Sequence, residues 1–127
     1  MALNYLGVIE TYNDKYEQYG EGFDANKAEE YFNKSLEVRK YFVGAHVNLA
    51  KLKNELGLED EAIEHYNNAI EISPNDEDLY YQIGLIYEDR DDKANAKSFY
   101  EKAIRFSSSG FSTMDEIEQK IKDWKVE

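Results

Sequence analysis

The chain has 127 residues, a formal net charge of −12 and no cysteine. Its length fits one domain that can bury a core, and the missing cysteines exclude disulfides and thiolate metal sites. The acidic balance argues against nucleic acid or an anionic membrane as partner, and no apolar stretch is long enough to span a membrane. The N-terminal residues lack the basic flank and cleavage site of a signal peptide, so we expect a cytoplasmic protein.

A single proline and strong helix formers throughout predict an all-α chain. The first helix is expected over about residues 3–19, where aromatic and aliphatic residues recur three and four apart. We expect this stripe to form the inner face of the first hairpin, with an aromatic ligand cage as the weaker alternative. Its members are Tyr5, Ile9, Tyr12, Tyr16, Tyr19 and Phe23. Gly20 and Gly22 then end the helix.

The second helix is expected over about 26–41 and the third over about 44–56. Gly57 suits the C-terminus of the third helix. One face of each helix is predicted to be buried. These faces hold Ala28, Phe32, Ser35 and Leu36 in the second helix, and Leu49, Leu52 and Leu56 in the third.

The next three helices are punctuated by caps and by a proline. The fourth, over about 60–72, is stopped by Pro74. The fifth begins after Asn75 or Asp76, which are good N-cap residues, and runs to about residue 89. The sixth covers about 92–106.

A seventh helix follows a Ser- and Gly-rich break. Thr113 and Glu116 resemble a capping box, and an apolar stripe follows with Met114, Ile117, Ile121 and Trp124. Because stacked helical repeats leave an open apolar end, we expect this helix to cover it. Its charged residues are expected to point outward, namely Glu118, Lys120, Lys122 and Asp123.

Two segments of the chain match at an offset of 34 residues. Small, aromatic and small residues recur in phase on one helix face. The matched pairs are Leu49 with Ile83, Ala50 with Gly84, Ala62 with Ala96, Tyr66 with Tyr100, and Ala69 with Ala103. The second helix extends the pattern backwards through Ala28 and Phe32.

This pattern resembles the tetratricopeptide repeat. The residues that carry it are Leu49, Ala50, Gly57, Ala62, Tyr66, Ala69 and Pro74, and the resemblance covers about residues 3–126 with the cap. Ser108 replaces the closing proline of the third repeat, and His46 and Tyr80 replace the early tryptophan. The resemblance implies a right-handed α-solenoid in one domain, 1–127. Its parts would be repeat one at about 3–42, repeat two at 43–76, repeat three at 77–110 and a capping helix at 113–125.

In this family the first helix of each hairpin lines a concave groove that holds a peptide or helix of another protein. The resemblance therefore implies a partner-binding groove made by Val47, Asn48, Lys51, Tyr81, Gln82, Leu85, Glu88 and Asp89. Asn48 stands where chaperone-binding members grip a peptide backbone. Lys51 is the only matching cation, because Asp78 and Gln82 stand where basic residues would be wanted, so a clamp for an acidic tail is disfavoured.

The acids between residues 71 and 92 suggest a client with basic and apolar residues, although a solvated flank is the favoured explanation of the acids themselves. The alternative to client binding is a structural protein that self-associates into homo-oligomers. An enzyme is not expected, because we find no metal-ligand spacing, phosphate-binding loop or nucleophile motif. The two histidines, His46 and His65, are too far apart in sequence to suggest a zinc pair, and no cofactor is predicted.

Overall fold

The computed structural model describes residues 2–12, 18–107 and 112–124. Within these residues the fold is all-α, as predicted, and the only β pairing is an isolated bridge between Tyr12 and Gln18. The helices are α1 (Ala2–Glu10), α2 (Ala25–Val38), α3 (Val43–Glu55), α4 (Glu59–Ile72), α5 (Glu77–Asp89), α6 (Lys93–Phe106) and α7 (Ser112–Trp124).

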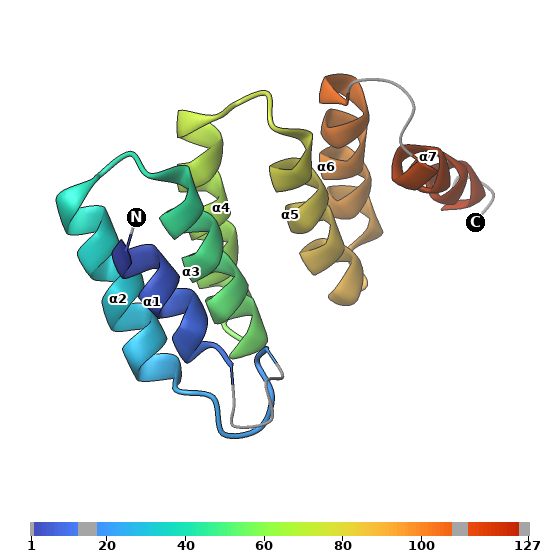
Figure 1. Cartoon of the computed structure of the whole chain (residues 1–127). Coiled ribbons are helices and arrows are strands. Elements are labelled where there is room, and N and C mark those ends of the chain that lie inside the picture. Colours follow the sequence, from blue (N-terminus) through green and yellow to red (C-terminus); the bar gives the residue numbers. More distant parts are fainter. Residues whose placement is uncertain (1, 13–17, 108–111, 125–127) are drawn as a thin grey trace. The chain divides into compact units, whose positions relative to one another are not determined.

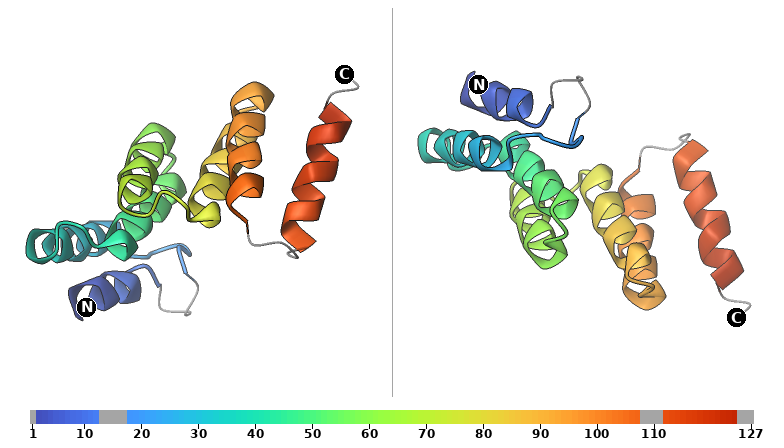
Figure 2. Two further views of the ribbon diagram at one scale, coloured as in Figure 1. Left: turned by 90° about the horizontal axis from the view of Figure 1, so that it is seen from above. Right: turned by 90° about the horizontal axis from the view of Figure 1, so that it is seen from below.

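Consecutive helices pair as antiparallel hairpins, α1 with α2, α3 with α4, and α5 with α6 (Figure 1). The chain forms two compact units, Met1–Ile72 and Ser73–Glu127. In the first unit α3 also packs on α2, so its two hairpins are stacked. In the second unit α7 lies beside α6 (Figure 2).

Small residues let the paired helices approach closely. Ala62, Ala69, Ala96 and Ala103 are all fully buried, as the 34-residue pattern predicted. At Gly84 the approach is so close that a Cβ atom would collide with the ring of Tyr100. An aromatic ring therefore fills the space that the small residues leave on the opposite helix.

The helix ends follow the local signals of the sequence. Asp76 caps α5 by accepting a hydrogen bond from the backbone N–H of Asp78, and Asp92 caps α6 through the N–H of Asn95. Gly57, just past α3, has a φ of +77°, a left-handed conformation that a residue with a Cβ atom adopts at a cost.

The first helix differs from the prediction, since it ends at Glu10 instead of near Tyr19. The N–H groups of Thr11 and Tyr12 bond three residues back, to Val8 and Ile9, which tightens and closes the last turn. Further along the chain, the N–H of Tyr19 donates to the carbonyl of Thr11.

The prediction that this stripe forms the inner face of the hairpin is therefore wrong for the first residues of the stripe. Tyr5 and Ile9 are exposed, and Gly7 is the buried residue that faces α2. Tyr19 and Phe23 do pack against the buried cluster between α2 and α3. Their rings meet edge to face, with centroids 5.6 Å apart. Tyr16 lies outside the described residues.

Two smaller expectations also need correction. Leu56 is 41% exposed because α3 ends at Glu55 and the chain turns away from the core. The last helix begins at Ser112, so Thr113 lies inside the helix and does not occupy the N-cap position. The expected role of α7 is otherwise supported, because Ile117 and Ile121 are buried against Ala96 and Tyr100 of α6.

Candidate protein-binding surface

The predicted groove residues on α3 lie in the first unit. Val47 and Asn48 are half-buried and Lys51 is exposed, whereas Leu49 and Ala50 are buried in the core. Part of α3 therefore remains accessible along its length. Among the described residues none forms an ion pair with Lys51.

The side chain of Asn48 is already engaged. Its Nδ2 donates to Oδ1 of Asn4 on α1, at 3.0 Å. This bond fixes the orientation of the Asn48 amide, so the residue is held in place before any partner arrives. Sequence reasoning could not find Asn4, because the first hairpin does not keep the 34-residue spacing.

The neighbouring lysine of α3 has a structural role. Lys53 is nearly buried, and its Nζ lies 2.8 Å from Oε1 of Glu29 on α2 and 3.9 Å from Oε2 of Glu61 on α4. Three helices of the first unit therefore meet at this ammonium group. Lys53 belongs to the packing of the hairpins and Lys51 to their accessible surface.

The predicted groove residues on α5 lie in the second unit, and two of them are less accessible than expected. Tyr81 and Leu85 are half-buried and pack against the cluster of Ala96, Tyr100, Ile117 and Ile121. The rings of Tyr81 and Tyr100 are tilted, with centroids 6.0 Å apart. The expected exposed strip of Tyr81 and Leu85 is thus partly covered by α6 and α7.

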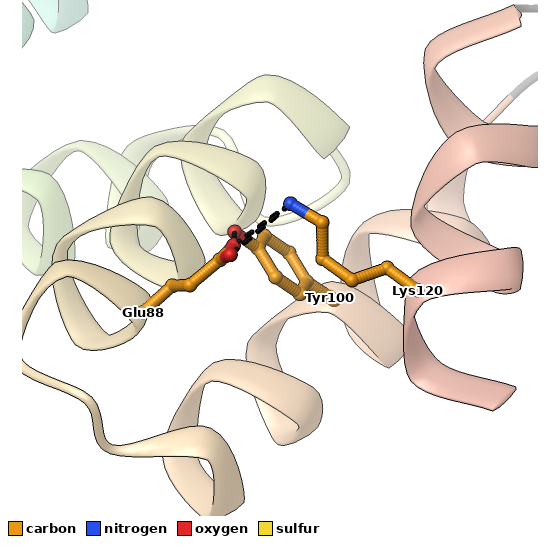
Figure 3. Close-up of polar contacts among 3 residues, drawn as sticks. All are labelled: Glu88, Tyr100 and Lys120. Carbon is orange, nitrogen blue, oxygen red and sulfur yellow. Dashed lines mark hydrogen bonds and ion pairs between the residues drawn. The ribbon is translucent and has the colours of Figure 1, made fainter. Parts of the chain in front are cut away.

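Glu88 is the centre of a polar contact that joins three helices (Figure 3). Its Oε1 accepts a hydrogen bond from Tyr100 Oη at 2.6 Å, and Lys120 Nζ lies 3.0 and 3.1 Å from its two carboxylate oxygens. Partial burial acts to raise the pKa of Glu88, but the hydrogen bonds from Tyr100 and Lys120 outweigh it and lower the pKa. The carboxylate thus carries its charge at neutral pH and is compensated within the chain.

This contact corrects one expectation. Lys120 was expected to point outward, but α7 brings it over the end of α5, where it pairs with Glu88. The last two predicted residues of α5 are Asp89, which is exposed, and Gln82, which donates to Asp78 Oδ1 at 3.4 Å.

Several acids of the 71–92 segment stabilise helix ends. Asp76 and Asp92 are N-caps, and Glu77 and Asp78 lie in the first turn of α5, where negative charge is favourable. The pKa of Asp92 is lowered by hydrogen bonds from the side chain and the backbone of Asn95. The acidity of this segment therefore follows in part from helix capping and not from partner recognition.

His46 and His65, distant in sequence, come together between α3 and α4. Their ring centroids are 6.2 Å apart, and neither buried Nδ1 atom has a hydrogen-bond partner among the described residues. The pKa of His65 is lowered by burial, by His46 and by Lys53. Among the described residues no group of three acidic, histidine or cysteine side chains is placed to hold a metal ion.

The structure adds a pocket that the sequence did not reveal. It has a volume of about 570 Å³ and lies in the first unit, with Leu36, Tyr41, His46 and Ile72 among its lining residues. These residues come from the end of α2, the loop that follows it, the start of α3 and the end of α4. None of the described helices is long and apolar enough to cross a membrane.

The stacked hairpins and their small–aromatic–small contacts define the class as an all-α helical-repeat protein. Comparison with known families specifies it further. A tetratricopeptide repeat model matches residues 53–90, and a second one matches residues 77–109. The chain therefore belongs to the tetratricopeptide repeat proteins.

Relatives and solved structures agree with this assignment. The chain is 31% identical over 99 residues to anaphase-promoting complex subunit 3 of Schizosaccharomyces pombe, a match that covers 75% of this chain and 15% of that protein. The chain thus spans about a seventh of the curated relative that it matches. The TPR domain of Sgt2 from Aspergillus fumigatus is similar with a TM-score of 0.64 and 22% identity, over 81% of this chain and 72% of the other.

A third similarity covers nearly the whole chain. The crystal structure of PcrH in complex with the chaperone binding region of PopD has a TM-score of 0.75 and 16% identity, over 98% of this chain and 90% of the other. At this level of identity the similarity establishes the shared fold.

Proposed function

We propose that the chain is a non-catalytic protein-interaction module that binds a peptide or helix of a client protein through the first helices of its hairpins. The observation that carries the proposal is the incomplete burial of α3 and α5, whose core faces are buried while Val47 is half-buried and Lys51 and Asp89 are exposed. The PcrH fold, which is crystallised with a region of PopD, supports the same use of a tetratricopeptide scaffold. We propose the cytoplasm as its compartment.

On α3, Val47 offers an apolar contact and Lys51, one turn further along, offers a charge. Asn48, oriented by Asn4, offers its amide to a peptide backbone. The client is therefore expected to provide an apolar side chain that covers Val47, next to a polar or acidic group that binds Lys51.

On α5, the proposed contacts are Tyr81, Gln82, Leu85, Glu88 and Asp89. Glu88 is compensated by Lys120, and the side chains of Tyr81 and Leu85 pack against α6 and α7. Asp89 is therefore the most accessible of these residues. A basic client residue would pair with Asp89, which contributes more to the association rate than to the affinity.

The test uses charge reversals at exposed positions, so that folding is preserved. Tagged wild-type chain, Lys51→Glu and Asp89→Lys are used to capture clients, and a captured client is then purified and titrated. We expect each reversal to weaken binding by about 3- to 30-fold, and the effect of Asp89→Lys to shrink at high salt.

Matched controls lie on other helices. Lys27→Glu on α2 and Glu118→Lys on α7 change the same charges at exposed residues outside the proposed surface. If these controls weaken binding as much as Lys51→Glu and Asp89→Lys do, net charge explains the effect and the proposed surface is wrong. Tyr81→Ala is unsuitable as a primary test, because it also removes a packed side chain.

A further inference from the structure

The first helix exposes an apolar face. Tyr5 is 68% exposed, Leu6 40% and Ile9 61%, and Tyr12, just past the helix, is 42% exposed. We call these four residues the α1 face. Glu10 is the only charged residue of α1 in a chain of net charge −12. A helix that is apolar on nearly all sides is normally buried on nearly all sides.

Two glycines show which residues of α1 and α5 occupy equivalent positions in their hairpins. Gly7 meets the ring of Phe32 on α2 in the way that Gly84 meets the ring of Tyr100 on α6. Each is the point where the first helix of a hairpin comes closest to the aromatic residue of the second. Gly7 and Gly84 are therefore equivalent positions.

In this register Leu6 corresponds to Ile83 and Ile9 to Ile86. Ile83 and Ile86 are 0% and 3% exposed, whereas their counterparts on α1 are open to solvent. The same two positions that are core positions of α5 are uncovered in α1.

The corresponding residues of α3 show what normally covers these positions. Leu49 and Leu52 are buried in one cluster with Ala28 and Phe32 of α2, the second helix of the preceding hairpin. The α1 face has the same kind of apolar side chains, and no described helix lies on it. It is therefore shaped to pack against a further helix.

The order of residues on the α1 face points to the occupant. Tyr5, Ile9 and Tyr12 follow one another four and three residues apart, so these three have nearly the same order in both directions. In an antiparallel pair of such faces, Tyr5 of each copy lies opposite Tyr12 of the other, and the two Ile9 side chains lie near the centre. This self-complementarity is what a two-fold interface requires.

Charge and the opposite end of the chain favour the same occupant. The α1 face carries no charge, so two copies of this acidic chain can meet there with less repulsion than elsewhere. The outer residues of α7 are exposed and mostly charged, among them Asp115, Glu118, Lys122 and Asp123. A head-to-tail array in which α7 of one copy covers α1 of the next would bury these charges against an apolar face.

We propose that the α1 face is a homodimer interface, in which α1 of one chain packs antiparallel against α1 of a second copy about a two-fold axis. The four side chains expose on the order of 400 Å² per copy, so the pair buries on the order of 800 Å². An interface of that size belongs to weak, reversible association, and the dimer is expected to dissociate on dilution.

The first experiment measures mass in solution by light scattering or sedimentation, from about 1 µM to about 300 µM, a range that brackets weak association. For the wild type the mean mass is expected to rise from 14.8 kDa towards twice that value. Ile9→Lys places two like charges at the axis and is expected to keep the mass at that of the monomer. Val38→Lys is the matched control, because Val38 is an aliphatic residue on α2 that is 74% exposed.

The second experiment uses the absence of cysteine from the sequence. Ile9→Cys is expected to form a disulfide-linked dimer under mild oxidation at least tenfold faster than Val38→Cys, because only a pair close to the axis meets the distance limits of a disulfide. Circular dichroism verifies that each variant keeps the helix content of the wild type.

Three results would overturn the proposal. The wild type stays monomeric over the whole range, or Val38→Lys abolishes the rise in mass as Ile9→Lys does, or the two cysteine variants oxidise at equal rates. Loss of client capture by Ile9→Lys together with an unchanged mass would assign the α1 face to another protein's helix. None of these results depends on Lys51 or Asp89, so the proposed client surface is tested separately.

Discussion

Replacing Ala96 with leucine should destabilise the second unit by overpacking. Ala96 is fully buried on α6 and lies in one cluster with Tyr100 of the same helix and Ile117 and Ile121 of α7. Alanine and leucine differ little in helix propensity, so the change in stability reports packing and not the helix itself. Three extra carbon atoms have no room here and must displace α7 or force strained rotamers.

The expected cost is about 1–3 kcal/mol. For a unit of this size each kcal/mol lowers the midpoint of thermal unfolding by about 4–8 °C. The assay is thermal and urea unfolding followed by circular dichroism, with Trp124 fluorescence as a local probe of α7, because Trp124 packs against the same cluster.

The control is Ala94→Leu, two residues away on the same helix, where the alanine is exposed. It adds the same atoms without entering the cluster and should change stability by less than about 0.5 kcal/mol. If Ala96→Leu unfolds at the same temperature as the wild type and as Ala94→Leu, then Ala96 is not at a close helix contact and the assigned register of α6 is wrong.

Four further predictions concern charge and the cap. Lys120→Met should leave Glu88 partly desolvated without its cation, and because both side chains are partly exposed we expect a loss below about 1 kcal/mol, measured by urea unfolding at low and high salt. The folded-state pKa of Glu88 is lowered, so its contribution to the free energy of unfolding is present above the unfolded pKa of about 4.3 and is lost as the pH falls through the lower folded value. Glu88→Gln should flatten this part of a stability-versus-pH curve. An unchanged curve would contradict the assignment of Glu88. The folded pKa of His65 is also lowered, so the folded state favours the neutral ring. The first unit should therefore lose stability as the pH falls below about 6.5. His65→Gln should reduce this loss if burial of the His65 ring causes it. Truncation after Ser107 should expose Tyr100 and the rest of the α6 surface and cause aggregation, whereas a truncated chain that stays monomeric and equally stable would show that α7 is not a cap.

Sequence by itself determined the helices and their pairing from the second helix onward. Short-range signals fixed the ends, as at Asp76, Asp92 and Gly57, because capping depends on residues within one or two turns. The 34-residue recurrence then fixed which faces meet, since Ala62, Ala96 and their aromatic neighbours are buried as the pattern required. These features are periodic, and a period can be read without coordinates.

Of the candidate surface, the sequence determined which residues of α3 lie off the core face, and the exposure of Lys51 agrees with it. It could not determine which polar groups were already paired. Asn48 bonds Asn4 across 44 residues and Glu88 bonds Lys120 across 32 residues. Neither partner shares a helix or a repeat position with the residue it contacts, so no local pattern encodes the pair.

The tertiary structure alone decided the first helix. A stripe of Tyr5, Ile9, Tyr12 and Tyr19 fits an uninterrupted helix, and periodicity gives no sign that the helix ends at Glu10. The face of α1 that packs inward was chosen by Gly7, because only a residue without a Cβ atom lets α1 come close to the ring of Phe32. Steric fit between helices distant in sequence therefore outweighed the apolar stripe, and it left Tyr5 and Ile9 on the surface.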